Sequence, residues 1–212
     1  MPSSRRKVSA VAEDFVAEIT RLERLDARNQ ANFSGRRSAK GRVSKKELHF
    51  LTEAIVFTAF RAYENYVRDI FLLYCQGKPT TKGVVVKSYL KPRDFAHAEE
   101  LVQSSMPLVN WSRPNVIIER AELYLEDGFP IKVPYSINRD MLGDILRIRN
   151  HIAHNSKESL HDYRKVVKKH YGTMPLSTPS PGEFLLLPEK KGKKYKLQTY
   201  LALLKAVSLD LS

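Results

Sequence analysis

The chain has 212 residues, and 42% of them are hydrophobic, which is enough apolar material for a domain with its own core. Lysine and arginine number 36 against 23 aspartates and glutamates, so the formal net charge is +13. This excess attracts polyanions, which makes nucleic acid the first partner class and an acidic membrane surface the second, unless the charge only aids solubility. The single cysteine, Cys75, excludes an internal disulfide and a CxxC-type zinc site.

The first residues do not have the pattern of a secretory signal. The basic stretch 5–7 is followed by a segment that acidic residues interrupt, where a signal peptide needs an apolar run. The longest apolar stretches also fall short of the roughly 20 residues that span a bilayer. We therefore expect a cytoplasmic protein with no membrane partner.

Helical periodicity dominates the first half of the chain. It predicts a helix over 9–29, then a basic loop over about 30–46, which is either a solvated linker or an arm that contacts phosphates. The segment 45–76 contains no glycine or proline and carries a wide apolar stripe, so it predicts the strongest helix. Shorter helices are expected over 92–103 and 114–126.

The middle of the chain begins with two prolines. Pro130 and Pro134 predict an extended segment over 129–135. Asn138 is then expected to cap a helix over 139–154. The apolar positions of this helix predict a buried stripe of Met141, Leu142, Ile145, Ile148 and Ile152.

The last third predicts one more helix over 159–171 and a proline-rich loop over 174–182. Residues 184–187 and 195–199, separated by a charged turn, are typical of a small β-hairpin. A short helix is expected to close the chain. The predicted fold is therefore mainly all-α, with at most a minor β-hairpin near the C-terminus.

The end of the helix 139–154 carries the residues best suited to chemistry. Asn150 and His154 are one helical turn apart and share a face, which Arg149 flanks. Histidine suits proton transfer near neutral pH, and arginine offers a rigid fork of donors that matches a phosphate. The three residues together predict a site that binds a phosphodiester and moves the proton of its 2′-hydroxyl. The alternative is a histidine that only favours the helix C-terminus, beside solvated arginines.

The stretch Arg149-Asn150-His151-Ile152-Ala153-His154 resembles the R-x4-6-H motif of the HEPN superfamily, in the form where a polar residue follows the arginine. Residues 59–67 resemble the aromatic-Glu stretch on an earlier helix of compact bacterial HEPN nucleases, which are often found in phage-defence and toxin loci. The resemblance covers about 45–171. It implies a HEPN-like helical bundle, with 1–212 as a single domain, the basic loop at about 30–46 and the hairpin and last helix within about 174–212.

Within this resemblance, Arg149 matches the motif arginine, Asn150 the polar residue and His154 the motif histidine, and all three are implied to be catalytic. Glu64 is the fourth expected catalytic residue. It lies on the expected buried face of its helix, and a buried carboxylate needs a partner, for which Arg149 is the candidate. The alternatives for Glu64 are an ion pair elsewhere in the bundle or exposure at the edge of the stripe.

Basic side chains near the motif are the expected RNA-binding residues. Arg147 also satisfies the motif spacing to His154, and His151 falls inside the motif as a surface or supporting residue. The helix over 159–171 presents a basic face that either binds RNA or is only solvated. The full expected set is Arg147, His151, Arg164, Lys165, Lys168 and Lys169.

The resemblance implies a homodimeric endoribonuclease with a composite active site, which cuts RNA without a metal or other cofactor. The products are a 2′,3′-cyclic phosphate and a 5′-hydroxyl. The sequence agrees on the metal, since it contains no HExxH, no Cys/His cluster and no paired-carboxylate motif. A tRNA or mRNA substrate, a role in phage defence or as a toxin, and an antitoxin or regulatory partner are further implications. The alternatives are a non-catalytic HEPN module that binds nucleic acid or docks a partner, and an accidental motif in a basic binding protein.

Overall fold

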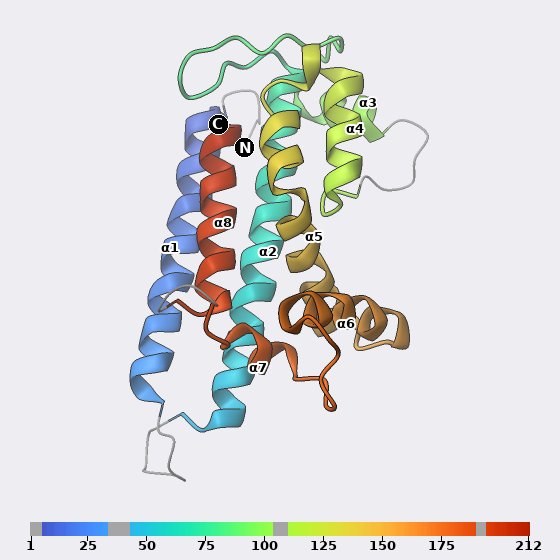
Figure 1. Ribbon diagram of the computed structural model, residues 1–212. Coiled ribbons are helices and arrows are strands. Elements are labelled where there is room, and N and C mark those ends of the chain that lie inside the picture. Colours follow the sequence, from blue (N-terminus) through green and yellow to red (C-terminus); the bar gives the residue numbers. More distant parts are fainter. Residues whose placement is uncertain (1–5, 34–42, 104–109, 190–193) are drawn as a thin grey trace. The chain divides into compact units, whose positions relative to one another are not determined.

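The computed structural model describes residues 6–33, 43–103, 110–189 and 194–212. This part of the chain is mainly α-helical, as predicted, and its only β structure consists of isolated bridges (Figure 1). None of its helices combines the length and apolar character that a membrane span requires. The helices are α1 (Val8–Asn32), α2 (Lys45–Cys75), α3 (Phe95–Gln103), α4 (Pro114–Tyr124), α5 (Lys132–His154), α6 (Lys157–Tyr171), α7 (Pro181–Leu185) and α8 (Lys196–Leu211).

The chain divides into two compact units. Unit 1 consists of Met1–Ala17, Ala62–Gly143 and Lys205–Ser212, and unit 2 consists of Glu18–Arg61 and Asp144–Leu204. The helices α1, α2, α5 and α8 each contribute a segment to both units. The arrangement as a single domain stays a prediction.

Tyrosines of α2 form part of the core of unit 1. Tyr63, Tyr66 and Tyr74 are buried, so these rings pack in the protein interior. The Tyr66 hydroxyl donates to the Ser208 carbonyl at 2.6 Å, and the Tyr74 hydroxyl donates to the Leu211 carbonyl at 2.5 Å. Because both carbonyls belong to the end of α8, these bonds fix that end beside α2 (Figure 1).

The short helix α7 packs against the first turns of α2 in unit 2. Pro181 occupies its first turn, where a missing N–H costs no hydrogen bond. The next residue, Gly182, donates its backbone N–H to Glu53 Oε1 at 2.8 Å. A Cβ at Gly182 would lie 2.4 Å from the His49 carbonyl oxygen, so only glycine allows this approach.

The prediction of an extended segment before α5 is wrong for most of its length. The helix begins at Lys132 and includes Pro134, which falls in the first turn, where the N–H has no intrahelical acceptor to lose. Asn138 is therefore inside the helix and is not its N-cap. Its side chain donates to the Pro134 carbonyl at 2.9 Å instead.

The prediction of a β-hairpin near the C-terminus is also wrong. Phe184 belongs to α7, and a single antiparallel bridge between Pro188 and Tyr195 replaces the strand pair. Proline has no N–H to donate, so it is poorly suited to extend a ladder. The charged turn at 190–193 lies outside the described residues.

The basic loop predicted over about 30–46 is described only at its two ends. Helix α1 continues to Asn32, and the backbone N–H of Val43 donates to the Asn32 carbonyl at 3.1 Å. Residues 34–42 lie outside the described residues.

Candidate active site

The end of α5 and the start of α6 form a tight corner in unit 2. Helix α5 ends at the exposed His154, and Asn155 then adopts a left-handed backbone conformation with φ of 43°, which asparagine tolerates. Ser156 caps α6: its hydroxyl accepts from the backbone N–H of Ser159 at 3.2 Å, and the Ser159 hydroxyl accepts from the N–H of Ser156 at 2.9 Å. Only two residues separate the helices, so His154 projects from a defined corner.

Arg149 and Asn150 lie one turn before this corner, and both are half-buried. The Arg149 guanidinium donates from Nη1 to Asn150 Oδ1 at 3.1 Å. Its central carbon also lies 5.4 Å from the centroid of the Phe57 ring of α2, a cation–π distance. The structure therefore brings the predicted Arg149 and Asn150 into contact and leaves the fork of Arg149 held between an amide and an aromatic ring.

His151 faces α6 and supports the corner. Its ring stacks on Tyr163 with centroids 5.0 Å apart and planes inclined by 18°. Its Nδ1 lies 3.2 Å from the hydroxyl oxygen of Ser159, in the first turn of α6. Burial lowers the pKa of His151, and the charge of Glu53 opposes part of that shift. His151 thus favours its neutral form and joins the last turn of α5 to the first turn of α6.

A buried carboxylate joins the same two helices further along. Asp144 of α5 is only 6% exposed. Its Oδ1 accepts from Arg147 Nη1 at 2.9 Å, and its Oδ2 accepts from Lys169 Nζ of α6 at 2.7 Å. Arg147, which also fits the motif spacing, is therefore held in an ion pair within its own helix. Of the two arginines, Arg149 is the one that contacts Asn150.

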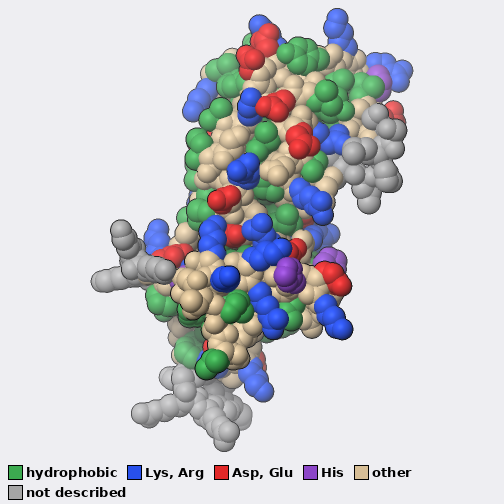
Figure 2. Space-filling model, turned by 45° about the vertical axis from the view of Figure 1, so that its right-hand side comes forward, with side chains coloured by type: hydrophobic (Ala, Val, Ile, Leu, Met, Phe, Trp, Pro, Cys, Tyr) green, Lys and Arg blue, Asp and Glu red, His purple; other side chains and the backbone are tan. Residues whose placement is uncertain are grey.

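Helix α6 presents basic side chains to solvent. Figure 2 shows Lys and Arg side chains gathered with histidines over this part of unit 2. Arg164, Lys165, Lys168 and Lys169 are all exposed, as a face that contacts a polyanion requires. Lys165 also pairs with Asp162 at 2.6 Å, so part of its charge is balanced within the helix.

Glu64 is half-buried rather than fully buried, and it lies in unit 1. Its charge contributes to the raised pKa of Tyr135, for which burial is the larger cause. Arg149 belongs to unit 2, and the expected pairing of these two residues stays a prediction.

A cavity beside α5, the helix that carries Arg149, Asn150 and His154 and is called the motif helix below, was not predicted from the sequence. It has a volume of about 360 Å³ and lies between the N-terminal half of α2 and the last turn of α5. A signal for it was present, because its α2 positions recur at helical spacing on one face. Its lining residues are Phe50, Glu53, Ala54, Phe57, Thr58, Ile152 and Ala153.

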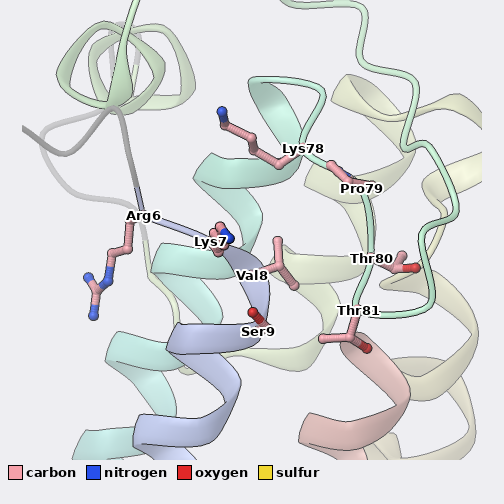
Figure 3. Close-up of a pocket in the computed structure, with 8 residues that line it drawn as sticks. All are labelled: Arg6, Lys7, Val8, Ser9, Lys78, Pro79, Thr80 and Thr81. Atoms are coloured by element: carbon pink, nitrogen blue, oxygen red, sulfur yellow. The ribbon is translucent and has the colours of Figure 1, made fainter.

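A second cavity, of about 680 Å³, lies in unit 1 between the start of α1 and the residues after α2 (Figure 3). Two of its basic residues, Arg6 and Lys7, precede α1, and Lys78 follows α2. The Arg6 side chain pairs with Asp69 at 2.5 Å and points away from the threonine side of the cavity (Figure 3). Its polar groups do not converge on one point, so we assign no ligand to it.

No cluster of three or more His, Cys, Asp or Glu side chains with the geometry of a metal site occurs in the part of the chain that the structure describes. Comparison of the chain with protein-family models, with curated proteins and with solved structures finds no significant match.

Proposed function

We propose that this chain is a metal-independent endoribonuclease whose active site is built from Arg149, Asn150 and His154. The observation that carries the proposal is the last turn of α5, where these residues have the HEPN-like pattern and His154 is exposed at the corner before a basic helix. The metal-free mechanism rests on the resemblance to HEPN nucleases.

The proposed reaction is an intramolecular transesterification. The 2′-oxygen of the RNA attacks the adjacent phosphorus, the bond from phosphorus to the 5′-oxygen breaks, and a 2′,3′-cyclic phosphate and a 5′-hydroxyl form. One imidazole takes the 2′-hydroxyl proton and another donates a proton to the leaving 5′-oxygen. In a homodimer with a composite site, His154 and the same residue of a second copy would share these roles.

Arg149 would bind the phosphate and stabilise the charge that builds on its oxygens. Its hydrogen bond to Asn150 and its position over Phe57 support this role, because they restrict a flexible side chain before substrate binds. Asn150 would orient the Arg149 side chain. Because Asn150 lies one helical turn before His154 on the same face, it would also reach the substrate.

The exposed cations of α6 would supply affinity for the RNA backbone that does not depend on sequence. The ion pair of Asp144 with Lys169 supports this arrangement, since it joins the basic helix α6 to α5. The proposal extends to a cellular RNA such as tRNA or mRNA as substrate, and to a role in phage defence or as a toxin under the control of an antitoxin or regulator.

The test is incubation of the purified protein with total RNA in excess EDTA, beside two variants and one control. Arg149→Ala and His154→Ala should each lower the cleavage rate by at least about 100-fold, the lower range for loss of an acid–base or phosphate-binding group. His97→Ala, which alters a histidine of α3 in unit 1, should cut like wild type. If all four proteins cut equally, the motif is not the active site. If wild type that is folded and dimeric does not cut, a missing activator or a non-catalytic binding module replaces this account.

A further inference from the structure

The cavity beside the motif helix has the composition of a site for a flat, aromatic ligand. Phe50 is 69% exposed at its edge, Phe57 forms part of its wall, and Ile152 and Ala153 line it from α5. Its volume of about 360 Å³ falls within the range of roughly 300–1,000 Å³ that is usual for small-ligand sites. The exposed ring of Phe50 offers a flat apolar face on which a base can stack.

The ring of Phe57 connects the cavity with the proposed phosphate site at Arg149. Phe57 lines the cavity, and the Arg149 guanidinium lies 5.4 Å from the centre of the same ring. Arg149 also precedes Ile152 and Ala153 by three and four residues, so it shares their side of α5. A phosphate on Arg149 therefore lies next to the cavity, within the reach of the nucleotide that carries it.

A carboxylate gives the cavity a chemical preference. Glu53 lines it, and one of its oxygens, Oε1, accepts from the backbone N–H of Gly182 at 2.8 Å. That bond fixes the side chain, while a carboxylate has about four lone-pair sites in all and only accepts hydrogen bonds. Such a group selects a ligand edge that donates. Adenine, cytosine and guanine offer an amino group, whereas the single N–H on the pairing edge of uracil lies between two carbonyl oxygens that a carboxylate repels.

We infer that this cavity is a nucleobase subsite, in which Phe50 and Phe57 stack on the base next to the scissile phosphate and Glu53 selects bases with an amino group over uracil. The inference rests on the proposed function and names the specificity determinant of that same site. Phe50 and Glu53 determine specificity here, and neither is needed to move a proton in the reaction.

The test measures binding in the absence of cleavage, so that its result is separate from the nuclease assay. The His154→Ala protein is titrated with fluorescent hexamers of adenylate, cytidylate and uridylate, and affinity is read by anisotropy. The adenylate and cytidylate hexamers should bind more tightly than the uridylate hexamer. Adding Phe50→Ala should weaken adenylate binding by about 5- to 150-fold, the range for loss of one stacking platform. Because Phe50 is exposed, this change should leave the fold intact.

Two further variants sharpen the result. Glu53→Gln keeps an oxygen for Gly182 but replaces the other carboxylate oxygen with a donor, so the preference should shift towards uridylate, whose carbonyls accept. Tyr89→Ala removes a 63% exposed aromatic ring of unit 1 and should change no affinity.

The outcomes distinguish the subsite from the nuclease assignment. Equal affinities for the three hexamers, no hexamer binding, or a Phe50→Ala variant that binds like Tyr89→Ala would overturn the subsite, whether or not wild type cuts RNA. Adenylate binding that Phe50→Ala weakens, together with a base preference that Glu53→Gln shifts towards uridylate, would support it. If wild type then failed to cleave, the proposed nuclease activity alone would fail.

Discussion

The substitution Asp144→Asn tests how the motif helix α5 and the basic helix α6 are held together. Each carboxylate oxygen of Asp144 accepts from a different cation: Oδ1 from Arg147 at 2.9 Å and Oδ2 from Lys169 at 2.7 Å. Asparagine keeps the volume but offers one acceptor and one amino group. That amino group would then face a cationic donor, so at least one charge-assisted bond is lost.

The expected loss of stability depends on the burial of the three side chains. A hydrogen bond to a charged group contributes about 1.5–3 kcal/mol to stability. The Arg147 and Lys169 side chains are 41% and 55% exposed, so water compensates part of that loss. We expect Asp144→Asn to lower the free energy of unfolding by about 1–2 kcal/mol. For a chain of this length, each kcal/mol corresponds to about 2–4 °C in Tm.

The matched control is Asp162→Asn, which raises the net charge by the same amount. Asp162 pairs with Lys165 at 2.6 Å, but its side chain is 52% exposed, so its substitution should change the free energy of unfolding by less than about 0.5 kcal/mol. Urea unfolding monitored by circular dichroism compares the stabilities of the two variants, and anisotropy compares their affinities for RNA. Equal stabilities of Asp144→Asn and wild type would refute the reasoning that this buried carboxylate joins the helices.

Individual side chains give three more predictions. Gly182→Ala should lower the free energy of unfolding by about 1–3 kcal/mol in urea titration, because its Cβ would meet the His49 carbonyl oxygen at 2.4 Å; an unchanged midpoint would show that α7 can move away. Burial lowers the pKa of His151 in the folded protein, so as the pH falls the unfolded chain takes up this proton first. The contribution of neutral His151 to the free energy of unfolding is therefore complete above about pH 6.5 and is lost as the pH falls through the folded-state pKa. His151→Phe should therefore lose less stability than wild type in thermal melts between about pH 7 and pH 5, and parallel profiles would contradict this. Lys168→Ala should reduce the slope of log affinity for RNA against log salt by about one, and an unchanged slope would exclude Lys168 from the RNA contact.

Local signals in the sequence were sufficient for most helices. The segment 45–76 was predicted as a helix and the structure gives Lys45–Cys75, because an uninterrupted apolar stripe without glycine or proline leaves no competing conformation. The prediction of where α5 begins failed at Pro134. A proline by itself favours an extended conformation for the residue before it, but the first turn of a helix accepts proline without losing a hydrogen bond. That choice depends on the residues after the proline, which a local rule does not include.

The sequence likewise predicted the local features of the candidate site but not the contacts between its helices. The motif residues of α5 are adjacent in sequence, so helix geometry alone placed Asn150 one turn from His154. The contact of Arg149 with Phe57, the stacking of His151 on Tyr163 and the cavity beside them depend on how α5 packs against other helices. The periodicity of one helix shows which of its residues share a face but not which helix packs against that face, so these contacts became visible only in the structure.

The proposed reaction is tested most sharply by the identity of the ends produced from a defined RNA in excess EDTA. The substrate is supplied in two forms, as all-ribose RNA and with a single 2′-deoxynucleotide on the 5′ side of the cut. Attack by the 2′-hydroxyl predicts a 2′,3′-cyclic phosphate and a 5′-hydroxyl from the first and no cleavage at that position in the second, because the attacking oxygen is missing. A 5′-phosphate product, or cleavage of the deoxy-substituted RNA at the same position, would contradict this reaction and the roles assigned to Arg149 and His154.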